Sequence, residues 1–213
     1  MKKSFAILVI MASAIMFSCT KDDSDGKIEG HEYVDLGLPS GIKWATCNIG
    51  AKTPEDYGDY FAWGETSPKA EYTEENSLTH RVKMKDISGS ARYDAATANW
   101  GSLWRMPTKD EIEELSFYCK FDWMQIDSVY VAKVIGPNGN SITLPVAGFI
   151  DGSILFDSDR RGLYCSSTPF ENNTGFDYDT DTYTYNLEFR NDDCYVDHRG
   201  YRASGYPIRP VSN

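Results

Sequence analysis

The chain has 213 residues, of which 41% are hydrophobic and 25% charged, and its formal net charge is -11. This composition is typical of a folded protein that buries a sizeable core. The excess of acidic residues argues against a nucleic-acid partner and against adsorption to anionic lipid, because both need a basic face. After residue 19 no stretch approaches the ~20 apolar residues of a membrane span.

The N-terminal residues resemble the signal of a bacterial lipoprotein. Two lysines precede an apolar run over residues 5–17, and Ser18-Cys19 closes it. This order predicts a signal peptide over residues 1–19 that ends at a lipidated (palmitate-bearing) Cys19, whose acyl chains are the only expected contact with the membrane. The alternative is a plain secretory signal with cleavage near Cys19.

Residues 20–32 are too polar to pack and predict a flexible tether. The Lys-Asp-Asp at residues 21–23 resembles the surface-export signal of Bacteroidetes lipoproteins. We therefore expect an outer-membrane lipoprotein displayed on the cell surface. Display on the periplasmic face is the alternative.

Residues 33–213 predict a single α+β domain with few, short helices and many short strands. Residues 33–36 and 42–45 flank a Pro-Ser-Gly turn signal and predict a hairpin. Thr53-Pro54-Glu55 predicts a short helix start, and residues 59–63 predict a strand. The polar residues 67–92 predict a long loop.

Two helices are predicted near the middle of the chain. Residues 94–100 suggest a short helix that Gly101 ends. Residues 109–119 form the stronger pattern, since Thr108 and Glu111 match a capping box and apolar residues recur at helical spacing.

The later residues predict strands and loops. A Gly-Pro-Asn-Gly-Asn turn joins residues 129–135 to residues 141–145 as a second hairpin. After residue 150 we expect short strands and polar loops. Core packing is the favoured role of the five tryptophans, which are Trp44, Trp63, Trp100, Trp104 and Trp123.

Several separated motifs agree, in order, with one known family. They are Tyr33–Gly41, Trp44–Asn48, Tyr57–Glu65, Trp104–Thr108 with Glu111, Gly136–Asn140 and Ile208–Val211. Over about residues 33–211 this set resembles Bacteroidetes lipoproteins that carry a Fibrobacter succinogenes major paralogous domain. The resemblance implies a C-type-lectin-like fold, related to the formylglycine-generating-enzyme group, with paired terminal strands, two helices and a long-loop region.

The resemblance does not extend to the related enzymes. Formylglycine-generating enzymes use a close pair of late cysteines with copper, whereas Cys165 and Cys194 are far apart in sequence. Cys165 also stands where the family commonly shows Trp. We therefore expect no enzyme activity, and a lipid-anchored enzyme is the least favoured reading. With Cys47 and Cys119, the four cysteines allow three disulfide pairings or remain free thiols.

Calcium is the only metal for which the sequence offers candidates. Asp177, Asp179 and Asp181 alternate, and Glu188 stands at the twelfth position counted from Asp177. Oxygen ligands at such steps hold calcium in known loops. Thr182 replaces the glycine that such a loop needs, so we expect no cofactor and favour an exposed strand.

Residues 164–206 have the composition of a binding surface. They are rich in Tyr, Asn, Asp, Ser, Thr and Gly, and the chain has no lysine after Lys133. Tyrosine offers a large contact area at low entropic cost, and aromatic faces beside Asp and Arg suit sugar rings. We expect loops here to bind an extracellular protein or glycan through Asp177, Tyr178, Tyr183, Tyr185, Asn191, Tyr195, His198, Arg199, Tyr201 and Arg202.

Residues 171–204 also resemble the variable region of C-type-lectin-fold proteins that retroelements diversify. Variable codons there encode Asn, Tyr, Asp, Ser, Thr, Gly, His, Arg or Cys, but never Lys, Gln, Met or Trp. The resemblance implies a diversified adhesin, and an ordinary polar loop region is the alternative. A structural component of the cell envelope or of a surface assembly is the second hypothesis for the whole protein.

Overall fold

The computed structural model describes residues 26–171, 179–191 and 193–213, without the side chain of His198. The expected signal peptide and Cys19 therefore lie outside the described residues. The elements are β1 (Lys27–Ile28), β2 (His31–Asp35), β3 (Lys43–Ala45), β4 (Tyr60–Ala62), α1 (Ala95–Trp100), α2 (Lys109–Tyr118), β5 (Lys120–Ile126), β6 (Val129–Ile135), β7 (Ser141–Pro145), β8 (Phe149–Asp151), β9 (Ile154–Phe156), β10 (Gly162–Pro169), η1 (Thr180–Thr182), β11 (Tyr183–Arg190), β12 (Asp193–Tyr201), β13 (Gly205–Pro207) and β14 (Val211–Ser212). The predicted α+β class with two α-helices agrees with this description.

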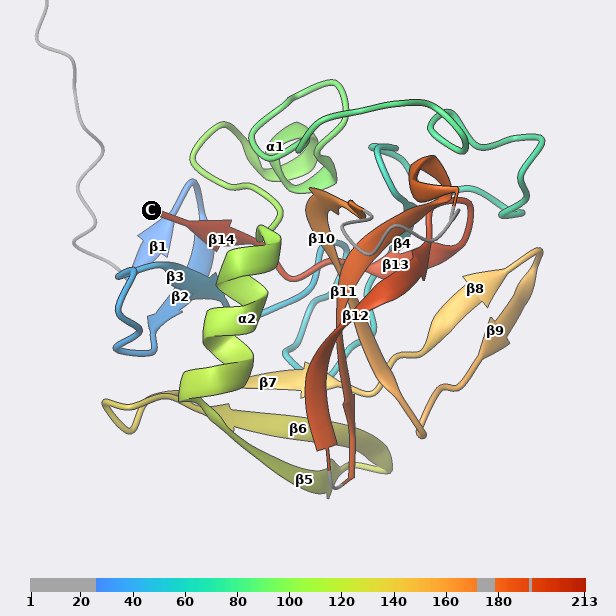
Figure 1. Cartoon of the computed structure of the whole chain (residues 1–213). Helices are drawn as coiled ribbons and strands as arrows, with labels where there is room; N and C mark the ends of the chain where they lie inside the picture. Colours follow the sequence, from blue (N-terminus) through green and yellow to red (C-terminus); the bar gives the residue numbers. More distant parts are fainter. Residues whose placement is uncertain (1–25, 172–178, 192) are drawn as a thin grey trace, which may run out of the picture.

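The two ends of the domain share one sheet, of order β1-β2-β3-β14 (Figure 1). Tyr33 pairs with Ala45 in the predicted hairpin, and Val211 pairs with Trp44. Strand pairing begins at Lys27 rather than at Tyr33, because Ile28 is buried and its carbonyl accepts a 2.9 Å hydrogen bond from Trp104 Nε1. The expected direct pairing of the terminal strands is wrong: both ends of the domain lie in one sheet, but β14 pairs with β3, and β2 separates β3 from β1.

Both helices begin where their caps predict. The Asp94 carboxylate accepts hydrogen bonds from the first turn of α1, and Gly101 ends that helix. Thr108 and Glu111 form the predicted capping box of α2. The helix then buries Ile112 and Leu115 against the main core.

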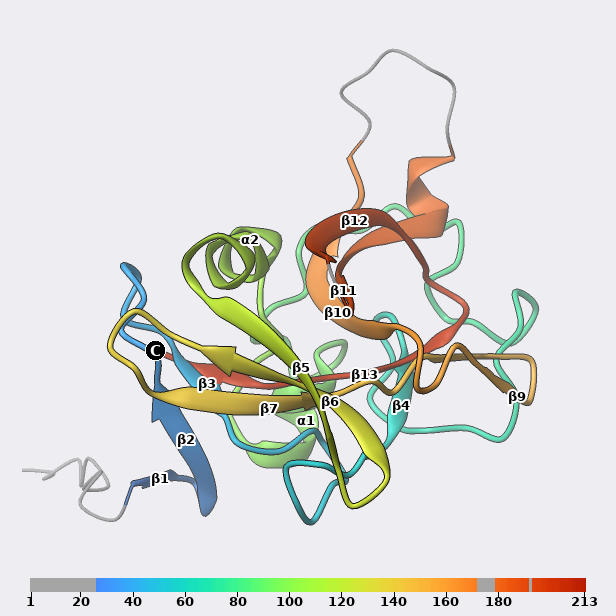
Figure 2. The same ribbon diagram turned by 90° about the horizontal axis from the view of Figure 1, so that it is seen from below.

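The three-stranded sheet β5-β6-β7 contains the predicted second hairpin (Figure 2). Its third strand, β5, follows α2 directly and is absent from the sequence prediction. The side chains of β5 are half-buried or exposed, so its sequence lacks a clear two-residue alternation. Phe121 nevertheless contacts Phe189 at 5.8 Å between ring centroids, which ties β5 to the core.

The C-terminal region differs from the prediction of short strands and loops. Strands β10, β11 and β12 form one antiparallel sheet, with eight, eight and nine residues. One face carries Tyr164, Leu187 and Phe189 into the main core with α2 and β5-β7. The other face of β11 and β12 carries polar side chains at every second residue, and this polar face holds the site described below.

The remaining sheet, of order β4-β13-β8-β9, lies beside a long irregular segment. Residues 67–92 form no helix or strand and join the sheets by one isolated bridge, Tyr72 with Gly152, so the predicted loop is confirmed. The helix predicted from Thr53 is wrong. Instead the Asp56 carboxylate accepts the backbone N–H groups of Lys52 and Thr53 and closes a turn.

Core packing is confirmed for three of the five tryptophans. Trp44, Trp63 and Trp104 are fully buried, whereas Trp100 and Trp123 are half-buried. All four cysteines within the described ranges are free, and burial raises the pKa of Cys165 to about 12. Over the part of the chain that the structure describes, no helix has the length and apolarity needed to cross a membrane.

Arg209 lies fully buried between β13 and β14 and connects distant segments. Its Nε donates to Asn48 Oδ1 at 2.8 Å, and its two terminal nitrogens donate to the carbonyls of Ala45, Thr46 and Thr143 at 3.0, 2.6 and 2.9 Å. The guanidinium therefore joins the C-terminal segment to the end of β3 and to the middle of β7.

We predict that Arg209→Met lowers the free energy of unfolding by at least about 3 kcal/mol, because several buried acceptors lose their donor. Urea denaturation followed by tryptophan fluorescence measures this change. The exposed Arg92→Met is the control, with an expected change within about 0.5 kcal/mol. Equal stability of the two variants would contradict a stabilising role for Arg209.

The second prediction concerns pH. Burial opposes ionisation of Glu111, but its two hydrogen bonds with Arg105, at 2.7 and 2.5 Å, and the Thr108 N–H outweigh burial and hold its pKa below 4.5. A lowered pKa in the folded state contributes stability above the unfolded pKa, and this stability is lost as the pH falls. We expect the wild type to lose more unfolding free energy between about pH 6 and about pH 3 than Glu111→Gln does. Parallel pH profiles would refute this assignment.

Candidate functional site

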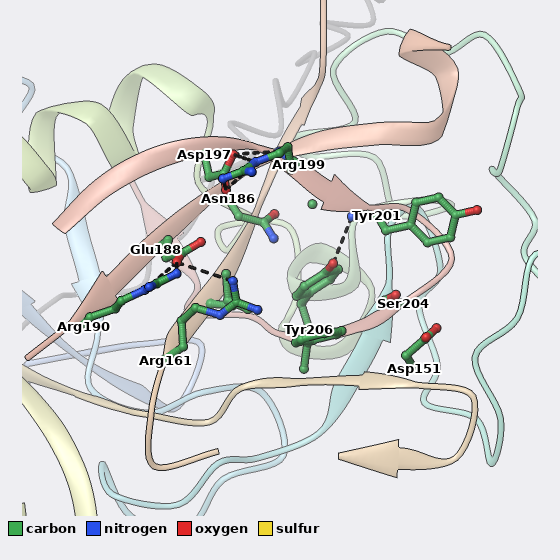
Figure 3. A pocket seen from close by; sticks show the side chains of 13 residues that line it. Asp151, Arg161, Asn186, Glu188, Arg190, Asp197, Arg199, Tyr201, Ser204 and Tyr206 are labelled. Atoms are coloured by element: carbon green, nitrogen blue, oxygen red, sulfur yellow. Dashed lines mark hydrogen bonds and ion pairs between the residues drawn. The ribbon is translucent and has the colours of Figure 1, made fainter. Parts of the chain in front are cut away.

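A cavity of about 450 Å³ opens on the polar face of β11 and β12 (Figure 3). Its walls come from the β10-β11-β12 sheet, from the β8–β9 hairpin and from the segment that leads into β13. The lining residues are Phe149, Asp151, Arg161, Leu163, Asn186, Glu188, Arg190, Asp197, Arg199, Gly200, Tyr201, Ser204 and Tyr206.

Glu188 is the buried charge of this cavity, with a side chain only 1% exposed. Arg190 donates to Glu188 Oε1 from Nη2 at 2.7 Å and from Nε at 3.0 Å, and Arg161 Nη1 lies 3.5 Å from the same oxygen. Burial and the nearby Glu188 raise the pKa of Tyr195. The Glu188 carboxylate is neutralised by the guanidiniums of Arg161 and Arg190, as a buried charge requires.

A second acid–base pair lies along β12. The Arg199 guanidinium contacts the Asp197 carboxylate side-on: Nε donates to Oδ1 and Nη2 donates to Oδ2, both at 3.0 Å. Asp197 is buried, whereas the Arg199 side chain is 69% exposed. The bidentate contact fixes the guanidinium plane and leaves part of it open to the cavity.

Asn186 supplies an unsatisfied acceptor. Its side chain is buried, and Oδ1 has no hydrogen-bond partner among the described residues. Figure 3 shows this side chain between the Asp197–Arg199 pair and Tyr206. Gly200 makes room for it, because a Cβ at Gly200 would lie 2.4 Å from Asn186 Oδ1. A buried acceptor without a donor costs roughly 1–3 kcal/mol unless a ligand donates to it.

Aromatic rings form the opposite wall. Phe149 and Tyr206 are stacked with centroids 6.0 Å apart, and the Arg161 guanidinium lies 5.7 Å from the Phe149 ring. Tyr206 accepts the Tyr201 backbone N–H at 2.9 Å, and burial raises the pKa of Tyr206. The cavity therefore combines aromatic faces, paired charges and one open acceptor.

The structure brings two of the ten predicted contact residues, Arg199 and Tyr201, into the cavity, with Tyr195 beside Glu188. Tyr183 packs against Tyr201, with 5.7 Å between ring centroids, and does not line the cavity. Tyr185 lies elsewhere, against Lys109 of α2 and Phe170. Asn191 is exposed beyond the end of β11. The predictions for Asp177, Tyr178 and the His198 side chain lie outside the described residues.

Arg202, also predicted as a contact residue, does not line this cavity. Arg202 is fully buried, and its guanidinium lies 4.3 Å from the Trp63 ring. It donates to the carbonyls of Tyr183 and Val82 at 3.0 and 2.9 Å. Burial lowers its pKa to about 10. The Arg202 side chain therefore connects the long segment 67–92 to β11 through hydrogen bonds.

The predicted calcium ligands that lie within the described ranges are not brought together in one site. Asp179 pairs with Arg81 at 3.1 Å, and Glu188 pairs with two arginines in the cavity. Asp181 belongs to the 3₁₀ turn η1 rather than to the exposed strand favoured from the sequence. Asp177 lies outside the described ranges, and within those ranges no group of three or more metal-ligating side chains is assembled.

Most of the cavity residues were not predicted from the sequence. The available signal was a two-residue period of polar side chains, with Asn186, Glu188 and Arg190 on β11 and Asp197, Arg199 and Tyr201 on β12. Alternation of this kind marks one face of a strand. Phe149, Asp151 and Arg161 come from a separate hairpin and turn, and only the tertiary fold brings them to the site.

The fold and the cavity together define a mainly β, α+β domain with a polar, aromatic-walled cavity. Comparison of the chain with protein-family models, with curated proteins and with solved structures found no match. The geometry of the cavity is therefore the basis for the functional argument.

We predict that Asn186→Leu leaves the fold intact and keeps or raises its stability, by up to about 3 kcal/mol, because the substitution removes a buried acceptor without a donor. The melting temperature measured by calorimetry tests this expectation. A large loss of stability would show that the Asn186 amide has a structural role, which is the opposite of the role assigned here.

Proposed function

We propose that the protein binds a sugar residue of an extracellular glycan in the cavity on the polar face of β11 and β12. The observation that carries this proposal is the buried Oδ1 of Asn186, which has no donor among the described residues and can accept a hydrogen bond from a ligand hydroxyl. Sugars present hydroxyl groups around a ring with apolar CH faces. The Asp197–Arg199 pair, Asn186 and the Phe149–Tyr206 wall offer both kinds of contact.

The size of the cavity supports a small ligand unit. Small-molecule sites span about 300–1,000 Å³, and this cavity measures about 450 Å³. Its buried acids Glu188 and Asp197 are paired with arginines before a ligand arrives, so a neutral hydroxyl can bridge these side chains without leaving a buried charge unpaired. This pre-organisation favours binding over a proton-transfer role, in line with the proposal that the protein is not an enzyme.

The cellular setting belongs to the same proposal. A C-type-lectin-like domain, anchored at the bacterial outer surface by a lipid on Cys19, would present this cavity to glycans outside the cell. Retroelement diversification of residues 171–204 would have to spare the core side chains of Leu187 and Phe189 and vary cavity positions such as Asn186 and Arg199.

A second candidate function is a structural role in a surface assembly. The observation that favours it is the β8–β9 hairpin, which projects from the domain in Figure 1. Ile154, Leu155 and Phe156 of this hairpin are 59%, 41% and 41% exposed. Exposed apolar residues gathered on one element mark a protein contact.

The test is a glycan array probed with the wild type, with Asn186→Leu and with Arg92→Ala, an exposed residue that lines no described cavity. We expect the wild type and Arg92→Ala to bind the same glycans and Asn186→Leu to bind them at least about tenfold more weakly.

Failure of the wild type to bind any glycan would refute the proposal. Equal binding by Asn186→Leu would refute this cavity as the site. Capture of a protein partner that depends on Ile154 and Phe156 would instead support the structural role.

A further inference from the structure

A second, smaller cavity adjoins the first. It measures about 290 Å³ and is lined by Asp157, Arg160, Arg161 and Arg190. Arg161 and Arg190 line both cavities. The consecutive residues Arg160 and Arg161 belong to a turn. Their backbone N–H groups donate hydrogen bonds to the Asp157 carbonyl at 3.1 and 3.0 Å.

The charges around this smaller cavity do not balance. Arg161 pairs with Asp157 and Glu188, and Arg190 pairs with Glu188. Arg160 is exposed and forms no ion pair with any described residue. Among the described residues, these three guanidiniums therefore have two carboxylate partners, Asp157 and Glu188, which leaves one local positive charge in a chain whose net charge is -11.

One donor in the cluster also lacks an acceptor. Arg161 Nε is buried and has no hydrogen-bond partner among the described residues, although the terminal nitrogens of the same guanidinium are paired. An unpaired charged N–H in a site of net positive charge is best satisfied by an anionic oxygen. Asn186 needs a donor in the main cavity, whereas Arg161 needs an acceptor near the smaller one.

We propose that the glycan bound by this protein is acidic, and that its carboxylate or sulfate group sits against Arg160, Arg161 and Arg190 while the sugar ring occupies the main cavity. This inference rests on the proposed glycan-binding function. Planar guanidiniums suit both anions, because each presents donors at the spacing of paired oxygens. The shared arginines place the anion and the ring in adjoining spaces.

The experiment compares matched sugars that differ only in charge. The probes are oligosaccharides ending in glucose, glucuronate or glucose 6-sulfate, and the same trio built on galactose. Binding is measured by calorimetry with the wild type, with Arg160→Glu, with Arg160→Lys and with the control Arg92→Glu. Arg160 is the chosen position because its exposed side chain forms no described ion pair, so its replacement leaves the buried pairs intact.

We expect the wild type to bind a uronate or a sulfated sugar at least about tenfold more tightly than its neutral partner. Arg160→Glu should remove this preference, Arg160→Lys should keep part of it, and Arg92→Glu should not change it. Higher salt should weaken binding of the acidic probe more than binding of the neutral one. The comparison of uronate with sulfate identifies which anion the site holds.

Other outcomes overturn the inference in distinguishable ways. Equal affinity for neutral and acidic probes would refute the anion site and leave the glycan-binding proposal standing. A preference for acidic sugars that survives in Arg160→Glu would refute the assignment to this cluster. Absence of binding to every sugar on the array and to every probe would refute both proposals together.

Discussion

One buried cation, Arg209, holds together parts of the fold that lie far apart in the sequence. Its hydrogen bonds reach the residues around β3 and the β7 strand, which are distant in sequence. The segment that carries Arg209 also supplies Tyr206 to the cavity on the polar face of β11 and β12 and Val211 to the terminal sheet. Closure of the domain and the shape of the cavity wall are therefore set by the same short stretch of chain.

The two faces of strands β11 and β12 have different roles: one packs into the main core and the other lines the cavity. Their apolar side joins the main core, so the sheet is held in place by Leu187 and Phe189. Their polar side can then carry buried charges such as Glu188, because the neighbouring arginines on the same sheet and on the turn beside it neutralise them. A rigid support of this kind keeps donors and acceptors at fixed positions and lowers the entropic cost of binding.

Local signals in the sequence predicted much of the fold. The capping box of Thr108 and Glu111 and the two turn-linked hairpins were predicted correctly, because each depends on residues close in sequence. Strand β5 was missed since tertiary contacts, rather than its own pattern, decide its structure. The burial of Arg202 was not predicted, because an arginine in a polar region is usually exposed, and the folded long segment covers it. The polar side of the cavity could have been predicted from the alternation along β11 and β12, whereas its aromatic wall comes from segments that only the tertiary fold brings to the site.

The alternation along β11 and β12 separates two kinds of information within the same residues. Inward positions such as Leu187 and Phe189 specify the architecture, and the intervening positions, Asn186 and Glu188, line the cavity and would specify recognition under the proposed function. Neighbouring codons are thus under different constraints. If the proposed function holds, substitutions at every second position would change recognition and leave the scaffold unchanged, provided that each buried acid keeps its basic neighbour.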